Sequence, residues 1–248
     1  MGVSTKEKAN ILVACMDRRL NQFIEENVNS TKAKTIVLRN AGADIDNLEG
    51  SIMEAVSLYD LQLAVVVVHN DCAAMKEISR IKTGTKSEFE EFRTMSKKYS
   101  SLVPEKLCEE NKGIQLKSLE GLLSISGSAA KVKSEMVDVS KAPISEGERK
   151  IAILIDTPEK PHTNYGEIAK RIGSEVSDVY FIQYIKNDNP IPDAGIAIKA
   201  GVRDIYILSG EKTLHDAGLL LRNISTKEFA SKTNIKVLEI EKSRSKVR

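Results

Sequence analysis

The chain has 248 residues, of which 41% are hydrophobic, so it can bury one large core or two smaller ones. Its 37 basic and 35 acidic residues nearly cancel and only 4% are aromatic, so the composition predicts no nucleic-acid partner. No apolar run approaches the roughly 20 residues that span a bilayer, and the polar start is unlike a signal peptide. Three cysteines, an odd number, favour a cytoplasmic protein without a disulfide framework.

The first part of the chain alternates between strand and helix patterns. Nearly uninterrupted runs of Ile, Leu, Val and Ala predict strands, and apolar residues at helical spacing predict the helices between them. The predicted order is strand, helix, strand, helix, strand, at residues 11–15, 20–28, 34–38, 48–61 and 63–68. Strands this apolar are typical of a parallel sheet with helices on both faces. The sequence therefore predicts an α/β fold whose parallel sheet core is flanked by helices.

Three metal-binding side chains follow two of these strands. Cys15 ends the first strand, and His69 and Cys72 follow the third. In the common doubly wound order the first and third strands are neighbours, so their carboxyl ends open into one crevice. Two thiolates and one imidazole are a donor set that zinc prefers, and three protein ligands leave a fourth position for water or substrate. The sequence therefore predicts a catalytic Zn²⁺ site at Cys15, His69 and Cys72.

Polar residues after the first and second strands extend this predicted site. Asp17 and Arg19 follow the first strand, and a solvated charge cluster is the alternative interpretation of them. The second strand leads into Arg39, Asn40, Ala41 and Gly42. An ordinary strand-to-helix turn is the alternative there, although glycine also permits a backbone conformation or a close approach that a side chain would block.

These residues resemble the motifs of the β-class carbonic anhydrases, and most closely those of the compact microbial and archaeal branch. The resemblance covers about residues 8–80 and rests on three segments in the family's order, Cys15-x-Asp17-x-Arg19, Arg39-Asn40-Ala41-Gly42 and His69-x-x-Cys72. It implies that Cys15, His69 and Cys72 bind Zn²⁺ and that the second segment shapes the substrate pocket. It also implies a hydrogen-bonded catalytic pair of Asp17 and Arg19, with Asp17 as a fourth zinc ligand in a closed state.

The resemblance implies a zinc lyase that reversibly hydrates carbon dioxide to bicarbonate and a proton. Zinc lowers the pKa of a bound water, and the resulting hydroxide attacks CO2. Asp17 would orient that hydroxide, and Arg19 would keep Asp17 ionised. Two alternatives stay open: hydrolysis of carbon disulfide or carbonyl sulfide at the same site, and a non-catalytic zinc-binding or sensory protein. The pair of Asp17 and Arg19 argues against the last, because structural zinc wants a fourth protein ligand.

Two positions depart from the family pattern, each by one added methyl group. Ala73 stands where the family usually has glycine, and Ala43 where it often has glycine. If either position needs a positive φ, alanine is strained there by about 1 kcal/mol or more. If the position only needs room, the pocket narrows.

The middle of the chain gives weaker patterns. Residues 87–99 predict a charged helix with an apolar stripe for packing, formed by Phe89, Phe92 and Met95. A contribution of this stripe to a dimer is the alternative. Residues 113–140 are ambiguous, because strand-like pieces such as residues 122–126 are interrupted by Gly and Ser.

A polar segment at residues 140–149 predicts a boundary between two domains. Residues 1–140 form the predicted zinc domain, and residues 150–248 form a second α/β domain with the same rhythm. Its strands are predicted at residues 151–155, 179–184, 205–208 and 236–240. Its helices are predicted near residues 164–173, 192–200 and 213–222.

The two predicted halves can be laid over one another. In this overlay Ser209 falls at the position of His69. Asp156 falls at or beside the position of Cys15, so the second half lacks the zinc ligands. One interpretation is a degenerate internal repeat, packed as a second subunit packs in dimers of the family. The other is a separate regulatory or ligand-binding domain. The expected assembly is a homodimer or an intramolecular pseudo-dimer, with CO2 and bicarbonate as small-molecule partners.

Overall fold

The computed structural model describes residues 6–142, 147–185 and 188–240, and within them the strands form one sheet of eight. The order across the sheet is β4-β3-β1-β2-β6-β5-β7-β8. The first half contributes β1 (Glu7–Cys15), β2 (Lys34–Asn40), β3 (Tyr59–His69) and β4 (Lys131–Val137). The second half contributes β5 (Lys150–Ile155), β6 (Val179–Tyr184), β7 (Asp204–Ser209) and β8 (Asn234–Glu239).

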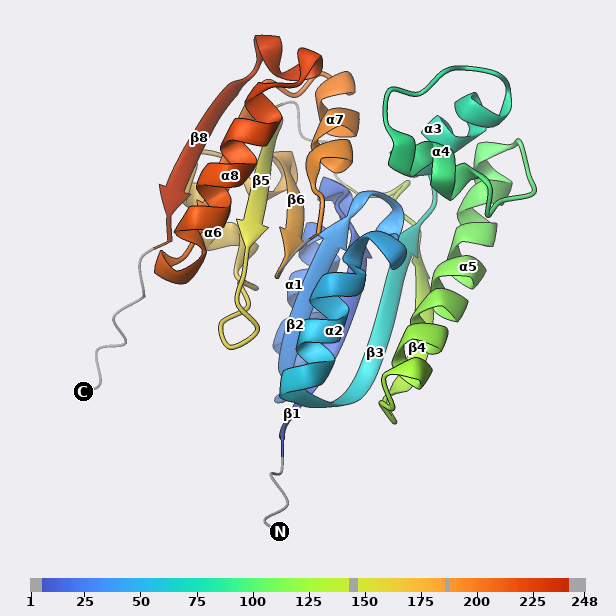
Figure 1. Ribbon diagram of the computed structural model, residues 1–248, viewed down its shortest axis with the longest axis vertical. Coiled ribbons are helices and arrows are strands. Elements are labelled where there is room, and N and C mark those ends of the chain that lie inside the picture. The colour runs from blue at the N-terminus through green and yellow to red at the C-terminus, as the bar shows by residue number, and fades with distance from the viewer. Residues whose placement is uncertain (1–5, 143–146, 186–187, 241–248) are drawn as a thin grey trace.

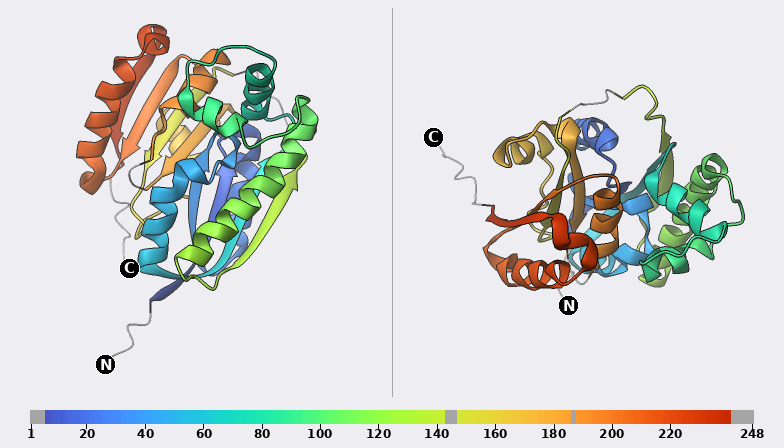
Figure 2. Two further views of the ribbon diagram at one scale, coloured as in Figure 1. Left: turned by 45° about the vertical axis from the view of Figure 1, so that its right-hand side comes forward. Right: turned by 90° about the horizontal axis from the view of Figure 1, so that it is seen from above.

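Helices cover both faces of this sheet (Figure 1). One face carries α1 (Asn21–Ser30) and α6 (Tyr165–Arg171). The opposite face carries α2 (Glu49–Leu58), α5 (Pro104–Ile125), α7 (Ile191–Lys199) and α8 (Leu214–Ser225), as the view from above in Figure 2 shows. The helices α3 (Ala73–Lys82) and α4 (Glu90–Ser96) follow the carboxyl end of β3. Short 3-10 turns lie at Arg18–Leu20, Ala41–Ala43, Asp46–Leu48, Val176–Asp178, Glu211–Thr213 and Glu228–Lys232.

The two central strands of the first half are neighbours, as the sequence predicts. β1 pairs in parallel with β3, and Ala14 lies opposite Val67 near the carboxyl ends. Residues 11–14 and 64–68 are buried, because helices cover these strands on both sides. This register brings the residues that follow β1 and β3 to the same edge of the sheet.

The second half repeats the strand order of the first. The order β2-β1-β3-β4 corresponds to β6-β5-β7-β8, and within each half the pairings are parallel. The halves join through β2 and β6, which are antiparallel and pair only at Arg39 and Gln183, near both carboxyl ends. The edge that carries the ends of β1 and β3 therefore faces the second half.

Two hydrogen bonds across this junction are reciprocal. Ser51, the third residue of α2, accepts at its hydroxyl oxygen from the backbone N–H of Ile185 at 2.7 Å. Asp193, the third residue of α7, accepts from the backbone N–H of Ala41 at 2.9 Å. Ile185 and Ala41 each follow the last residue of β6 or β2. Equivalent positions in the two halves therefore make equivalent contacts, as in a twofold-symmetric pair.

Several element boundaries differ from the sequence predictions. The helix predicted to reach residue 61 ends at Leu58, because Tyr59 begins β3. The Tyr59 hydroxyl is buried, accepts from Lys34 Nζ at 2.6 Å and donates to the Pro158 carbonyl at 3.1 Å. These two bonds hold the residue in the sheet.

The segment after α4 was predicted least well. Residues 122–126, which looked strand-like, belong to the end of α5, and β4 begins only at Lys131. A Cβ built at Gly113 or Gly121 meets nothing, so these glycines mark exposed helix positions rather than breaks. The helix predicted at residues 87–99 is confined to Glu90–Ser96, and the apolar stripe is buried, which confirms its packing role: Phe89, Phe92 and Met95.

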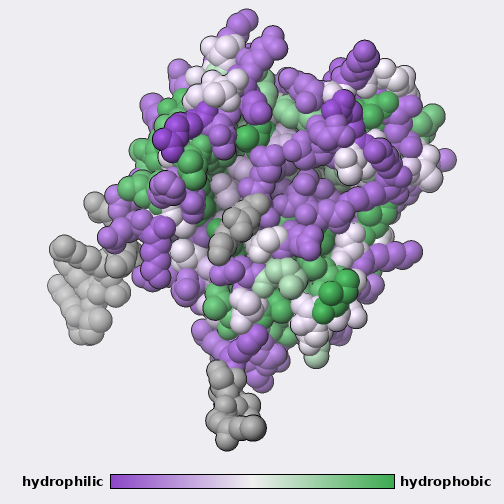
Figure 3. Space-filling model, in the orientation of Figure 1, coloured by the Kyte–Doolittle hydropathy of each residue, from purple (hydrophilic) through white to green (hydrophobic). Residues whose placement is uncertain are grey.

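The surface carries hydrophobic residues in separate patches among hydrophilic ones on the face drawn in Figure 3. Large hydrophobic side chains are exposed on α2 and α8, at Met53, Leu58, Leu214 and Leu219. None of the helices that the structure describes combines the length and the apolar character that a membrane crossing requires.

Candidate metal centre

Three metal-binding side chains converge at the edge of the sheet that faces the second half. Cys15 ends β1, His69 ends β3 and Cys72 immediately precedes α3. Their ligand atoms all lie within 4.8 Å of one another, and each residue is buried. The two sulfur atoms are 3.9 Å apart. Two sulfurs bound to one tetrahedral zinc at about 2.3 Å would be about 3.8 Å apart, so the donor set fits the metal.

The imidazole of His69 presents one nitrogen to this cluster. Its Nδ1 lies 2.6 Å from the carbonyl oxygen of Asn70, which makes Nδ1 the protonated donor and Nε2 the lone-pair nitrogen. Nε2 is buried and has no hydrogen-bond partner among the residues that the structure describes. Buried polar atoms are normally paired, and a bond to zinc would satisfy this one.

The two thiols are held by backbone groups at the ends of short turns. The backbone N–H of Gly42 donates to Cys15 Sγ at 3.3 Å. Cys72 stands at the N-cap of α3, a position that favours a thiolate. The hydrogen bond between the thiols lowers the pKa of Cys15 and raises the pKa of Cys72. Metal binding requires both thiols to be deprotonated, so it releases protons from this pair.

Asp17 and Arg19 form a bidentate pair beside the cluster. Asp17 Oδ1 accepts from Arg19 Nε at 3.0 Å, and Oδ2 accepts from Nη2 at 2.7 Å. Asp17 Oδ2 lies 3.8 Å from His69 Nε2. Burial acts to raise the pKa of Asp17, but the hydrogen bonds from Arg19 and the neighbouring positive charges outweigh it and hold the pKa below its ordinary value. The carboxylate is thus kept ionised beside the metal ligands, outside the three-residue cluster.

A second carboxylate, Asp71, holds the same arginine from the other side. Arg19 Nη1 donates to Asp71 Oδ2 at 2.8 Å, and Asp71 also pairs with Lys76. Asp71 has a φ of 56°, a left-handed conformation that aspartate tolerates better than most residues. Sequence reasoning gave this residue no role. The signal available was a carboxylate between His69 and Cys72, in the loop that the predicted pairing of the first and third strands brings near Arg19.

Arg39 lies behind the site, fully buried, and does not line its cavity. Its guanidinium donates to the carbonyls of Cys15 and Asp17, at 3.0 Å each from Nη2, and to Asn21 Oδ1 at 2.6 Å. The same group lies over the rings of Tyr165 and Phe181, at 5.1 and 5.8 Å from their centroids. Arg39 therefore supports the loop that carries Cys15 and Asp17, and it is itself packed against the second half.

The remaining residues of the second motif form the turn beneath the cavity. Gly42 has a φ of 78°, so the backbone conformation expected of this glycine is present. A Cβ there would lie 3.2 Å from the end of Met95. Asn40 donates to the carbonyl of Asp44 at 2.9 Å. Of the four residues 39–42, Ala41 alone lines the cavity.

The two alanines in place of the family's glycines have different consequences. Ala43 has a φ of 56°, so its methyl group is strained there by about 1 kcal/mol or more. Ala73 is the first residue of α3 and has no positive φ. Its added methyl group instead narrows the cavity, which it helps to line.

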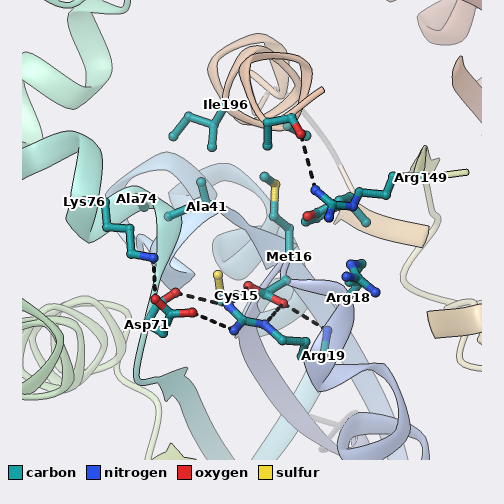
Figure 4. Close-up of a pocket in the computed structure, with 15 residues that line it drawn as sticks. Cys15, Met16, Arg18, Arg19, Ala41, Asp71, Ala74, Lys76, Arg149 and Ile196 are labelled. Carbon is teal, nitrogen blue, oxygen red and sulfur yellow. Dashed lines mark hydrogen bonds and ion pairs between the residues drawn. The ribbon is translucent and has the colours of Figure 1, made fainter. Parts of the chain in front are cut away.

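A cavity of about 280 Å³ opens beside Cys15 and Asp17 (Figure 4). One wall comes from the first half and includes Ala41, Asp71 and Lys76. The other wall comes from the second half, and its residues are Arg149, Tyr180, Ile196, Ala197 and Ala200. Both halves of the chain therefore shape access to the metal cluster.

Comparisons with known proteins gave one family match and several similar solved structures. A family model for carbonic anhydrase matches residues 10–152. Among solved structures, the chain is similar to a carbonic anhydrase from Glaciozyma antarctica, with 18% identity and a TM-score of 0.37, over 57% of this chain and 82% of that one. It is also similar to the β-carbonic anhydrase CcaA, with 22% identity and a TM-score of 0.40, over 55% and 72%. No curated protein matches the chain.

The family model carries the assignment. Its match covers more than half of the 248 residues and contains the cysteine, histidine, aspartate and arginine positions described above. It ends at residue 152, so nearly all of the second half lies outside it. The resemblance inferred from the three motifs is confirmed, and this protein belongs to the β-class carbonic anhydrase family.

Proposed function

We propose that the protein hydrates carbon dioxide reversibly to bicarbonate, using a zinc ion held by Cys15, His69 and Cys72. One observation carries the proposal: the buried, unpartnered Nε2 of His69 faces two thiols whose 3.9 Å separation suits zinc. Zinc held there would supply a Lewis acid that makes water nucleophilic near neutral pH. Two thiolates neutralise the metal charge, so the working pH is expected to lie somewhat above neutral.

The side chains beside the cluster have distinct tasks in this proposal. Asp17 accepts a hydrogen bond from the attacking water and so orients its lone pair toward CO2. Arg19 occupies both oxygens of Asp17 and keeps the carboxylate ionised and directed. Asp71 fixes the far side of Arg19. Because Arg19 holds Asp17 in this way, the arrangement supports an open site rather than one in which Asp17 binds the metal.

One part of the cavity lining is apolar and suits a small, uncharged substrate. Next to Cys15 its lining includes the methyl groups of Ala41 and Ala74, and Ile196 contributes from the second half. A linear apolar molecule can bind to such a surface without leaving a polar group of the protein buried and unpaired. Carbon disulfide and carbonyl sulfide share this shape and remain the alternative substrates of the same site.

Stopped-flow CO2 hydration with a pH indicator tests the proposal. Zinc-loaded protein is expected to turn over rapidly, and protein stripped of zinc by a chelator is expected to lose that activity and regain it when zinc is restored. Zinc content, measured on the same samples, is the control. Absence of CO2 turnover with zinc fully bound would contradict the proposal and direct the same assay to carbon disulfide and carbonyl sulfide.

The second half supports a further proposal about assembly: it acts as a built-in partner for the metal-binding half, in the manner of a degenerate second subunit. The repeated strand order and the reciprocal contacts of Ser51 and Asp193 support this. At the strand ends equivalent to the metal cluster, β7 ends in Ser209 and Asp156 follows β5. Neither residue reproduces the soft donor set, so the second half contributes a wall and supporting contacts.

Asp193 allows a test of this partner role. It is buried, and burial raises the pKa of its carboxyl group well above the ordinary value. Asp193→Ala is expected to lower stability by about 1–3 kcal/mol, because the Ala41 N–H is left buried and unpaired. It is also expected to speed zinc release to a colorimetric chelator, since Ala41 leads into the turn that donates to Cys15.

Two variants serve as controls for Asp193→Ala. Asp193→Asn keeps an acceptor oxygen for Ala41 and is expected to have the smaller effect. Ser51→Ala removes the reciprocal contact, which serves the loop after β6, and is expected to lower stability without faster zinc release. If Asp193→Ala and wild type release zinc at the same rate, the second half does not support the metal centre.

A further inference from the structure

The charged side chains around the cavity do not balance one another. Four cationic residues line it, namely Arg18, Arg19, Lys76 and Arg149, against two carboxylates, Asp17 and Asp71. Asp17 is paired with Arg19, and Asp71 with Arg19 and Lys76. Within the described part of the chain, neither Arg18 nor Arg149 has a carboxylate within 4.0 Å. Among the described residues, two positive charges at one cavity thus have no carboxylate partner: Arg18 from the first half and Arg149, which directly precedes β5.

Both unpaired arginines are anchored by a single nitrogen and keep other donors available. Arg18 Nη1 donates to the carbonyl of Ser177 at 2.6 Å, and Arg149 Nη1 donates to the carbonyl of Ala200 at 3.4 Å. Arg18 is buried, while Arg149 is exposed at the mouth of the cavity. Figure 4 shows the two side chains on the same side of the cavity, opposite Asp71 and Lys76.

A phenol lies on the same wall. Tyr180 is partly buried, lines the cavity, and its hydroxyl makes no hydrogen bond to any residue that the structure describes. Its hydroxyl adds a further donor for an oxygen ligand to the lining that carries the two guanidinium groups. The group formed by Arg18, Arg149 and Tyr180 offers several donors, no acceptor carboxylate and a net charge of two.

We propose that Arg18 and Arg149, assisted by Tyr180, bind the bicarbonate anion at the mouth of the cavity. This inference rests on the proposed function, because it assigns a place to the product of that reaction. The guanidinium fork matches a planar oxyanion with two adjacent oxygens, whereas uncharged CO2 gains little from it. These side chains therefore bind bicarbonate more tightly than CO2, and residues outside the metal-binding half contribute part of that difference in affinity.

The overall equilibrium limits which kinetic constants can report the loss of bicarbonate binding. The equilibrium constant of hydration is fixed, so any substitution changes kcat/KM by the same factor in both directions. A residue that binds bicarbonate in the ground state raises KM and kcat for dehydration together when it is removed. The direct readout is therefore the inhibition constant of bicarbonate as a product in CO2 hydration.

Arg149→Gln is the variant of choice, because the side chain is exposed and its loss leaves no buried group unpaired. We expect the inhibition constant for bicarbonate to rise by about threefold to tenfold, with a weaker dependence on ionic strength. Arg222→Gln removes the same charge from the exposed surface of α8, which contributes nothing to the cavity. It is expected to leave the inhibition constant within about 1.5-fold of wild type.

A binding measurement separates this inference from the proposed function. Bicarbonate is titrated into zinc-loaded wild type and Arg149→Gln at chemical equilibrium, and the bound anion is measured by isothermal titration calorimetry, which needs no net turnover. If wild type lacks CO2 turnover, the proposed function fails, and weaker binding by Arg149→Gln would still support an anion site. If turnover is present and Arg149→Gln matches Arg222→Gln in both the inhibition constant and the binding titration, the inference is wrong.

Discussion

Asp17→Asn is expected to lower CO2 turnover by about a hundredfold to a thousandfold while zinc stays bound. The substitution keeps the size of the side chain but replaces an ionised acceptor with a neutral amide. Arg19 would lose the bidentate partner that now occupies two of its nitrogens. The three metal-binding side chains are untouched, so the metal content measured by atomic absorption should equal that of wild type.

Asp71→Asn is the matched control for this prediction. Asp71 pairs with the same arginine, but its side chain is half exposed. Its substitution is expected to lower turnover by less than about tenfold, because an exposed pair contributes little. Equal turnover in Asp17→Asn and wild type, with zinc retained in both, would remove Asp17 from the mechanism.

Arg39→Met is expected to lower the free energy of unfolding by about 2–4 kcal/mol and to weaken zinc retention. Three acceptors lose the hydrogen bonds from Arg39 in a buried setting, namely the carbonyls of Cys15 and Asp17 and Oδ1 of Asn21. The Asp17 carbonyl keeps the bond from the Leu20 N–H. The variant no longer has to bury a charge, which offsets part of this cost, so the expected value stays below the sum of the four lost bonds. Urea denaturation of the zinc-loaded protein measures it.

Arg39→Lys separates the charge of this residue from its shape. Lysine keeps the positive charge but cannot bridge two carbonyls with one planar group. We expect it to recover less than half of the stability lost in Arg39→Met, and to leave zinc retention below wild type. If Arg39→Lys matches wild type in both measurements, the fork geometry is not what holds the Cys15 loop.

The positions of the metal-binding residues were predictable because they depend on short sequence patterns within the first half of the chain. Cys15 and His69 each end an apolar strand, Cys72 follows His69 by three residues, and parallel strands bring such ends to one edge of the sheet. The doubly wound order then places Cys15 next to His69 without reference to any distant residue. The same reasoning located β5 to β8 to within a few residues, because their apolar runs are equally clear.

The orientation of Arg39 was not predictable, because it depends on residues far along the chain. Its motif placed it in the pocket, yet the rings of Tyr165 and Phe181 draw the guanidinium to the back of the loop. The second wall of the cavity has the same origin, since Arg149 and Tyr180 belong to no recognisable motif. The extent of α5 was missed for another reason: its exposed glycines resemble breaks in sequence.

Because one chain contains both halves, mutations can change one half without changing the other. In a homodimer, the helix position occupied here by Ser51 and Asp193 would hold the same residue on both sides of the contact. Here one side has a hydroxyl and the other a carboxylate. The covalent link also keeps the two surfaces at a high effective concentration, so dilution cannot separate them. Mutation can therefore alter the wall of the cavity without altering the thiolates, a freedom that identical subunits do not have.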